Sequence, residues 1–333
     1  MLSVKDVTIP FLKKLFTNAS SESLFKHQFP TKILVNAFFE PSTRTSLSFE
    51  SAMYKLGGKV ITFQKDMSSL KKGESFNDTI RTLSTFGDVM ILRHSEKEAI
   101  EEAIKSSTIP IINGGNGSSE HPTQALLDLF TIYKHLKSIQ FAHHISYLDE
   151  YTKNFSTKRL HILFIGDILN SRTIHSLIDL LVKFENITIQ FLPYNGCEPT
   201  YGLKAKIFHK CNQREPIVIN KDILKIQDYD IIYSTRLQQE RSDKGEKPHI
   251  IINKNFMSQM KKEAIVMHPL PRNEEIHPEV DNDPRCMYFQ QMENGLLIRM
   301  SLLANIFYHQ DIPSKKKRNP NNTFDTFEEI ELV

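Results

Sequence analysis

The chain alternates between short apolar runs and segments in which apolar residues recur every three or four positions. In the first half, Phe49, Met53 and Leu56 share one face of a predicted helix that ends at Gly57 and Gly58. Runs typical of buried strands occupy residues 32–39, 59–63, 89–92 and 109–112, and further helices are predicted at residues 76–83, 96–105 and 122–136. This alternation predicts an α/β fold built on a parallel sheet.

The pattern restarts after a polar stretch at residues 137–158. Strand-like runs follow at residues 161–165, 187–192, 217–220, 230–235 and 264–268, with helical segments between them. Two such halves predict an α/β protein of two domains, each a mainly parallel sheet flanked by helices, with the active site in the interdomain cleft. The expected ranges are residues 1–136, with a returning C-terminal helix at about 291–310, residues 137–290, and a disordered tail at 311–333.

Composition narrows the class of protein. A chain of 333 residues with 40% apolar and 24% charged residues can bury one sizeable core per domain, and its net charge of +3 favours neither nucleic acid nor a membrane as a partner. The three cysteines lie far apart and without zinc-site spacing, so we expect no disulfide framework and no metal site. Charges interrupt the N-terminal apolar run, which favours a cytoplasmic protein.

Basic and hydroxyl residues recur at the points where predicted strands end. They are Ser42, Thr43, Arg44, Thr45, Arg93, His121, Gln124, Arg172, Arg236, Gln238 and the segment 268–272. In an open α/β sheet, the carboxyl ends of the strands line the ligand crevice. A ring of cations there, in a chain of little net charge, predicts a substrate with several negative groups.

Residues 42–45 (STRT) lie between a predicted strand and a predicted helix. The N–H groups of a helix N-terminus, the hydroxyls and the Arg44 guanidinium can together bind a phosphate, although short Ser/Thr runs also cap helices without binding anything. His121 and Gln124 open another helix about one turn apart and form a plausible polar pair, but a lone histidine is more often structural. By local pattern alone, Lys72 belongs to an ordinary exposed turn.

Arg172 and Arg236 each follow a predicted strand of the second half. Two guanidinium groups fit two carboxylates better than one phosphate, although each is also compatible with a surface ion pair. Residues 266–271 (VMHPLP) place two prolines around one leucine at a strand end. This rigid turn can present backbone carbonyls to a ligand or can simply end the strand.

Eight segments, in one order, resemble the catalytic chain of the aspartate carbamoyltransferases. They read FFEPSTRTSLSFESAMYKLGG, KKGESFNDTIRTL, ILRH, HPTQALLDLFTIY, GD with SRTIHSL, STRLQQER, MHPLPR and YFQQMENGLLIRMSLLANIF, between residues 38 and 307. The sister ornithine carbamoyltransferases share the first half but usually carry a Ser-Met-Gly segment and an HCLP loop in the second. Here residues 268–271 read HPLP, and Arg236 suits the second carboxylate that aspartate has and ornithine lacks.

The resemblance implies a first domain that binds carbamoyl phosphate and a second that binds L-aspartate, joined in a cofactor-free step of pyrimidine biosynthesis. For carbamoyl phosphate, it implies that the phosphate is bound by Ser42, Thr43, Arg44, Thr45 and Arg93, and the carbamoyl oxygen by Thr45, Arg93 and His121. The carbamoyl NH2 is expected to contact Gln124 and the backbone oxygens of Leu270 and Pro271. For aspartate, it assigns the α-carboxylate to Arg172 and the β-carboxylate to Arg236 and Gln238. Ser69 (or Ser68) and Lys72 are expected from a neighbouring subunit of a homotrimer with shared active sites. Glu40 is expected to bridge to Arg172 and Arg241 on domain closure.

Other functions fit parts of the pattern. A carbamoyltransferase for another acceptor, such as ornithine, shares the donor half, and a catalytically silent relative would act as a structural or regulatory partner. A nucleotide-binding oxidoreductase is disfavoured because no GxGxxG turn follows Gly166 and Asp167. The resemblance leaves open whether separate regulatory chains join the trimer. The chain departs from the family in its long connection at 137–158, its tail and Asn116, where the family often has aspartate.

Overall fold

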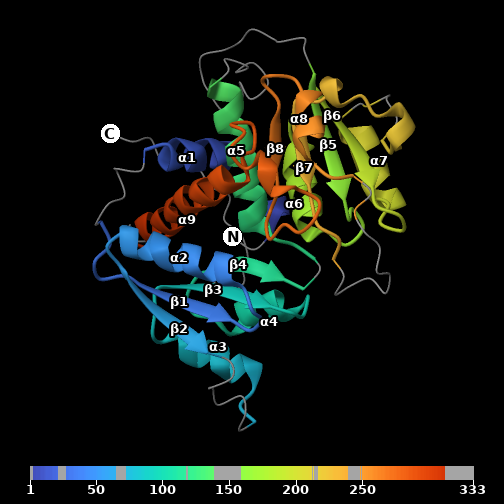
Figure 1. Cartoon of the computed structure of the whole chain (residues 1–333). Helices are drawn as coiled ribbons and strands as arrows, with labels where there is room; N and C mark the ends of the chain where they lie inside the picture. Colours follow the sequence, from blue (N-terminus) through green and yellow to red (C-terminus); the bar gives the residue numbers. More distant parts are fainter. Residues whose placement is uncertain are drawn as a thin grey trace.

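A computed structural model describes residues 3–21, 28–64, 73–117, 119–138, 159–211, 213, 217–238, 248 and 250–311. These residues form two four-stranded sheets, each flanked by helices, with further helices between the two halves (Figure 1). Every strand pair in both sheets is parallel. The predicted fold class, a two-domain α/β protein, is confirmed.

The first sheet has the strand order β2-β1-β3-β4. Its elements are β1 (Ile33–Phe38), α2 (Thr43–Lys55), β2 (Lys59–Gln64), α3 (Phe76–Ser84), β3 (Val89–His94), α4 (Ala99–Ser106) and β4 (Ile111–Asn116). The strand order reverses between β1 and β3, because β2 lies on one side of β1 and the later strands lie on the other. Ligands of such sheets bind beyond the carboxyl ends of the two strands at the reversal.

The second sheet repeats this arrangement in the order β6-β5-β7-β8, with its reversal between β5 and β7. Its elements are β5 (Leu160–Gly166), α6 (Arg172–Leu181), β6 (Ile187–Pro193), α7 (Tyr201–Lys210), β7 (Ile231–Ser234), α8 (Lys254–Ser258) and β8 (Ile265–Met267). The prediction of a strand at residues 217–220 is wrong. Val218 forms only an isolated bridge with Phe191, because the short helical turn η7 (Lys221–Ile223) redirects the chain immediately afterwards.

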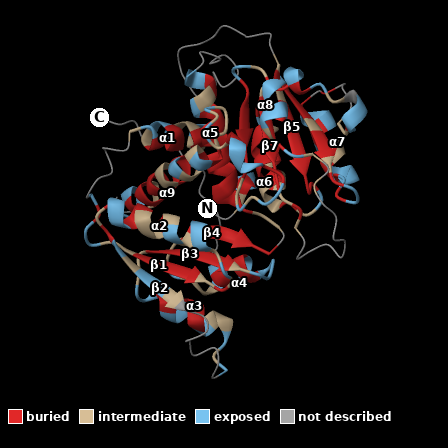
Figure 2. Ribbon diagram, in the orientation of Figure 1, coloured by how far each residue is buried: buried red, intermediate tan, exposed pale blue. Residues whose placement is uncertain are grey.

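Helices α1 (Ile9–Ala19), α5 (Pro122–Ser138) and α9 (Tyr288–Asp311) complete the architecture, and α9 contacts α1, α2, α5 and β8. The described residues also include the short helical turns η1 (Val4–Asp6), η8 (Ile226–Asp228) and η10 (Pro278–Val280). The largest cluster of buried apolar side chains includes Leu34 of β1, Phe130 of α5 and Ile162 of β5. The two sheets therefore share this cluster through these helices (Figure 2). Each sheet also has a buried cluster of its own, which includes Val35 and Leu92 in the first sheet and Leu163 and Val266 in the second.

Two predicted regions extend beyond the described part of the chain. The long connection expected at 137–158 lies outside it from residue 139 onwards, and the tail lies outside it from residue 312 onwards. Among the helices that the structure describes, none is both long enough and apolar enough to cross a membrane.

Gly166 marks a close approach between the ends of β5 and β7. Its φ is 121°, and a Cβ atom placed on it would meet the Thr235 backbone oxygen at 2.3 Å. We therefore predict that Gly166→Ala lowers the free energy of unfolding by about 2 kcal/mol or more, measured by urea denaturation. The matched control is Gly202→Ala in α7, where a Cβ atom meets nothing within 4 Å. It should leave stability unchanged or raise it by up to about 1 kcal/mol, and equal losses in both variants would contradict this account.

Candidate active site

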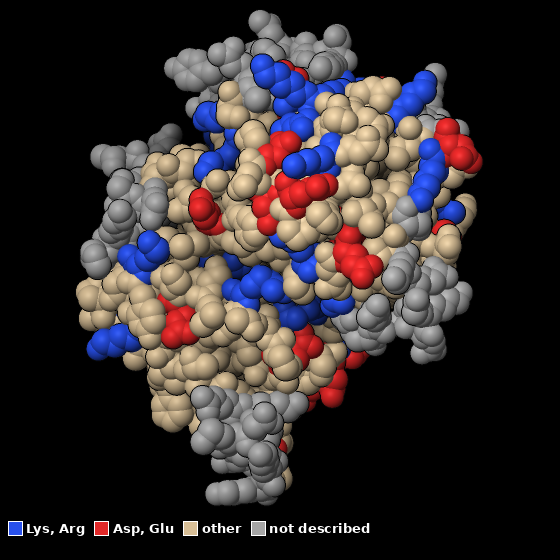
Figure 3. All heavy atoms as spheres, in the orientation of Figure 1, with Lys and Arg blue, Asp and Glu red and all other residues tan. Residues whose placement is uncertain are grey.

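The strand ends at the two reversals carry the basic residues singled out in the sequence. Residues 42–45 follow β1, Arg93 lies in β3, Arg172 begins α6 after β5, and Arg236 follows β7. Lys and Arg side chains gather between the two halves of the molecule on the face seen in Figure 3. The sheet ends thus supply cations to one boundary from both domains.

Arg44 reaches across this boundary from the first turn of α2. Its Nη2 donates a hydrogen bond of 3.0 Å to the backbone oxygen of Leu270. Burial, and then the nearby charges of Arg236 and Arg93, lower the pKa of the Arg44 guanidinium from its ordinary value. Arg44 is therefore repelled by one guanidinium of its own domain and by one of the other domain, which favours binding of an anion beside it.

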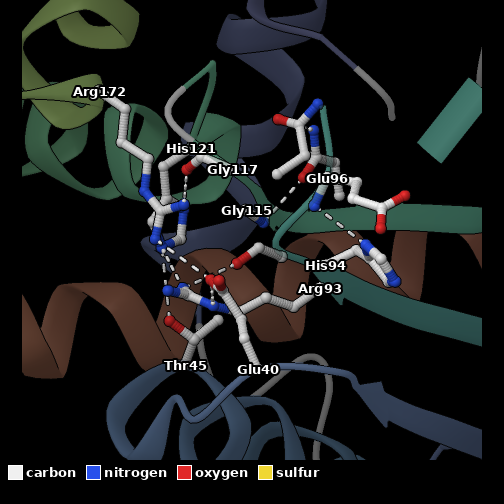
Figure 4. Close-up of polar contacts among 12 residues, drawn as sticks. Glu40, Thr45, Arg93, His94, Glu96, Gly115, Gly117, His121 and Arg172 are labelled. Atoms are coloured by element: carbon white, nitrogen blue, oxygen red, sulfur yellow. Dashed lines mark hydrogen bonds and ion pairs between the residues drawn. The ribbon is translucent and has the colours of Figure 1, made fainter. Parts of the chain in front are cut away.

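One carboxylate, that of Glu40, joins cations of the two domains. Its Oε1 accepts a hydrogen bond of 2.6 Å from Arg93 Nε and lies 3.6 Å from Arg172 Nη2. Arg172 also donates to the backbone oxygen of Gly117, so it is anchored to the loop after β4 (Figure 4). The expected contact of Glu40 with Arg172 is present, the one with Arg93 was not expected, and Arg241 lies outside the described residues.

His121 lies between Thr45 and Arg93. Thr45 Oγ1 and Arg93 Nη1 are each 3.5 Å from His121 Nε2. The His121 backbone N–H donates to Ser176 Oγ at 3.0 Å, which ties the start of α5 to α6 of the other domain. Burial, followed by the charges of Arg172, Arg93 and Arg299, lowers the pKa of His121 well below 6.5. A neutral imidazole, a hydroxyl and a guanidinium thus converge where an oxygen acquiring negative charge can be stabilised.

Helices α2 and α6 at the boundary begin without a side-chain cap, as does the outer helix α4. Ser42 and Ser171 hold the cap positions of α2 and α6, yet neither makes a side-chain capping hydrogen bond. The side chains of Thr8, Ser75 and Thr200 do cap α1, α3 and α7. The capping role considered for Ser42 is therefore not observed, and the first N–H groups of α2 and α6 are not satisfied by their cap side chains.

Gln238 is held by the loop that follows β5. Its Nε2 donates to the Asn170 backbone oxygen at 3.0 Å, and its backbone N–H donates to Asp167 Oδ2 at 3.2 Å. Asp167 also accepts a hydrogen bond of 3.1 Å from Asn170 Nδ2. Asp167, which the sequence offered as a weak hint of a dinucleotide site, instead supports the segment that carries Arg236 and Gln238.

The structure brings most of the predicted site residues to the boundary. Contacts or charge interactions join Arg44, Thr45, Arg93, His121, Arg172, Arg236 and Leu270. Ser42, Thr43 and Pro271 adjoin members of this set, and Gln124 follows His121 by one turn of α5. Ser69 and Lys72 lie outside the described residues. Within the described ranges, no three His, Cys, Asp or Glu side chains are grouped so as to hold a metal ion.

Fold and site define a two-domain α/β protein that gathers cations from two sheet reversals at one boundary, an arrangement suited to anionic ligands. Residues 1–134 match the family model described as aspartate/ornithine carbamoyltransferase, carbamoyl-P binding domain. Residues 158–306 match the model for the Asp/Orn binding domain of the same family. The chain belongs to the aspartate/ornithine carbamoyltransferase family, as the sequence resemblance indicated.

Relatives cover nearly the whole chain. The aspartate carbamoyltransferase catalytic subunit of Thermoplasma acidophilum is 40% identical over 321 residues, covering 92% of this chain and 97% of that protein. The structure of Trypanosoma cruzi aspartate transcarbamoylase with carbamoyl phosphate and aspartate has a TM-score of 0.78 at 35% identity, covering 91% of this chain and 93% of that one. The multifunctional protein CAD of Squalus acanthias is 38% identical over 325 residues, but the chain spans only 13% of its length.

We predict that the His121 imidazole of the folded chain is neutral at pH 7 and titrates well below 6.5, because burial and neighbouring cations disfavour its protonated form. The measurement is a pH titration of the histidine side-chain NMR signals, with His121 assigned from the His121→Asn variant. The unfolded chain binds a proton at His121 more readily than the folded chain does. The contribution of His121 to the free energy of unfolding therefore becomes less favourable as the pH falls below 6.5. Arg172→Ala should raise the His121 pKa. Titration of His121 at or above its ordinary pKa would contradict the described surroundings.

Proposed function

We propose that the chain is an aspartate carbamoyltransferase, which transfers the carbamoyl group of carbamoyl phosphate to the α-amine of L-aspartate in pyrimidine biosynthesis. The observation that carries the proposal is that Arg44 lies close enough to both Arg236 and Arg93 for their charges to act on it. Arg44, which is suited to a phosphate, thus has beside it a guanidinium of the other domain that is suited to a carboxylate. Relatives named aspartate carbamoyltransferase, and the neighbour structure that contains both substrates, support this choice of donor and acceptor.

In the proposed donor site, Ser42, Thr43 and Arg44 bind the phosphate at the N-terminus of α2. Thr45, Arg93 and His121 then face the carbamoyl oxygen. Negative charge develops on this oxygen as the amine attacks, so hydrogen-bond donors fixed in advance lower the barrier. Loss of one such donor typically lowers the rate by about 10²–10³-fold.

In the proposed acceptor site, Arg172 binds the α-carboxylate of aspartate, and Arg236 with Gln238 binds the β-carboxylate. The deprotonated α-amine forms a bond to the carbamoyl carbon, the bond from that carbon to the phosphate oxygen breaks, and phosphate leaves with the amine proton. Holding both substrates in line supplies a further part of the acceleration. No cofactor takes part in this scheme.

We further propose that the chain works as a cytoplasmic homotrimer whose active sites are shared between subunits. The support is the family resemblance around Ser69 and Lys72, which would enter the site of a neighbouring subunit. A separate regulatory chain is compatible with this assembly, and nothing in the described residues requires one.

The purified chain is expected to form N-carbamoyl-L-aspartate and phosphate from carbamoyl phosphate and L-aspartate. With ornithine as acceptor, the rate should be at least about 100-fold lower, because Arg236 would face no second carboxylate. The measurement is product formation by chromatography with each amine under identical conditions. Turnover with ornithine alone would favour the alternative acceptor, and a folded chain inactive with every amine would favour a catalytically silent relative.

Mixing two inactive variants tests whether sites are shared. Arg44→Ala and Lys72→Ala should each lower the rate by about 100-fold or more while leaving the thermal transition in place. In trimers assembled at random from equal amounts of both, about one site in four would combine an intact Arg44 with an intact Lys72 from the neighbour. About a quarter of wild-type activity should therefore return. A mixture no more active than its parents would count against sharing, and unfolding of either variant would reveal a structural residue.

A further inference from the structure

Asp128 is a fully buried carboxylate in α5, one turn beyond Gln124. Its Oδ1 accepts hydrogen bonds from Gln124 Nε2 at 2.9 Å and from Gln291 Nε2 at 2.7 Å. Its Oδ2 accepts a hydrogen bond of 2.8 Å from the Tyr233 hydroxyl. These partners lie in α5, α9 and β7, so one carboxylate joins elements from both domains next to the candidate site.

An ionised carboxylate can only accept hydrogen bonds, so it fixes which end of a neighbouring amide faces it. Gln124 presents its NH2 group to Asp128, and its oxygen is the end left for a ligand. With the amide in the opposite orientation, Gln124 would offer a donor to the ligand instead. Asp128 therefore determines that Gln124 is an acceptor.

The same carboxylate orients a second amide. Gln291 directs its NH2 group to Asp128, and its oxygen accepts a hydrogen bond of 2.8 Å from the His268 backbone N–H. His268 Nδ1 in turn accepts a hydrogen bond of 2.9 Å from the Leu270 N–H. Asp128 thus also supports the turn that carries the Leu270 carbonyl.

This orientation does not depend on the charge of Asp128. Burial raises the pKa of Asp128 to about 7, against the opposing hydrogen bonds from Tyr233, Gln291 and Gln124. When the carboxyl is protonated, its proton can lie on Oδ2 and face the Tyr233 hydroxyl, which can accept as well as donate. Oδ1 remains an acceptor for both glutamines in either state.

We propose that Asp128 is a positioning residue that gives the site its preference for a donor substrate ending in NH2 over one ending in CH3. The inference rests on the proposed function, in which Gln124 and the Leu270 carbonyl bind the carbamoyl NH2. An NH2 group can donate to both acceptors. A methyl group cannot, so the Gln124 oxygen would have no donor from the ligand in a desolvated site, while the Leu270 oxygen would keep only its hydrogen bond from Arg44. Asp128 acts through the two glutamines and does not contact the substrate.

The test compares two stable ligands, phosphonoacetamide and acetonylphosphonate, which differ only in NH2 versus CH3 next to the carbonyl. Calorimetry on the full chain should show that the wild type binds the amide about 10- to 100-fold more tightly than the ketone. In Asp128→Leu combined with Tyr233→Phe, the carboxylate and its hydroxyl partner are removed together and the branched shape is kept. This double variant should lose most of the preference through weaker amide binding, with ketone affinity unchanged within about threefold.

Tyr233→Phe alone is the matched control, because it removes the partner of Oδ2 and leaves Oδ1 to orient both glutamines. It should keep the wild-type preference. If the double variant does not fold, Asp128→Ser replaces it with the same expectation, since its hydroxyl is too short to take the place of Oδ1.

Three results would overturn the inference: equal binding of the two ligands by the wild type, an unchanged preference in the Asp128 variant, or a proportional loss for both ligands. Formation of N-carbamoyl-L-aspartate by the wild type is assayed alongside. Its absence would defeat the proposed function, whereas its presence together with any of the three results would defeat the role of Asp128 alone.

Discussion

Repulsion between guanidinium groups held at one boundary is the constraint on which this site depends. Arg44 and Arg93 come from the first domain and Arg236 from the second, and the charges of Arg93 and Arg236 both act on Arg44. Glu40 offsets part of this repulsion by contacting both Arg93 and Arg172. The negative groups of bound substrates would offset more of this repulsion. Substrate binding would therefore also stabilise the contact between the two domains.

Much of the fold could be predicted because strands of parallel sheets are buried on both faces and give continuous apolar runs. The runs at 89–92 and 161–165 lie within β3 and β5. The run at 217–220 looks the same in sequence, but a strand also needs a length of chain in register with a neighbour, which a local pattern does not reveal. The pattern likewise missed α1, whose buried face packs against α9 nearly three hundred residues later.

The sequence likewise predicted one part of the candidate site and missed another. Arg44 and His121 could be predicted because polar residues at strand ends and helix starts reveal their location locally, and the family resemblance supplied their expected roles. Glu40 as the partner of Arg93, and Asp128 as the partner of Gln291, depend on contacts across 53 and 163 residues of sequence. A single sequence shows where an acid lies along the chain and not which donor the folded chain brings to it.

The core shared by the two sheets bears on how such a protein can diverge. Side chains of α5 pack in the same apolar cluster as β1 of one sheet and β5 of the other. Replacing either half wholesale, for instance by recombination with a paralogue, would leave that interior layer mismatched and destabilised. New acceptor preferences are therefore more accessible through point changes in the loops beyond β5 and β7, where side chains can vary without disturbing the shared interior.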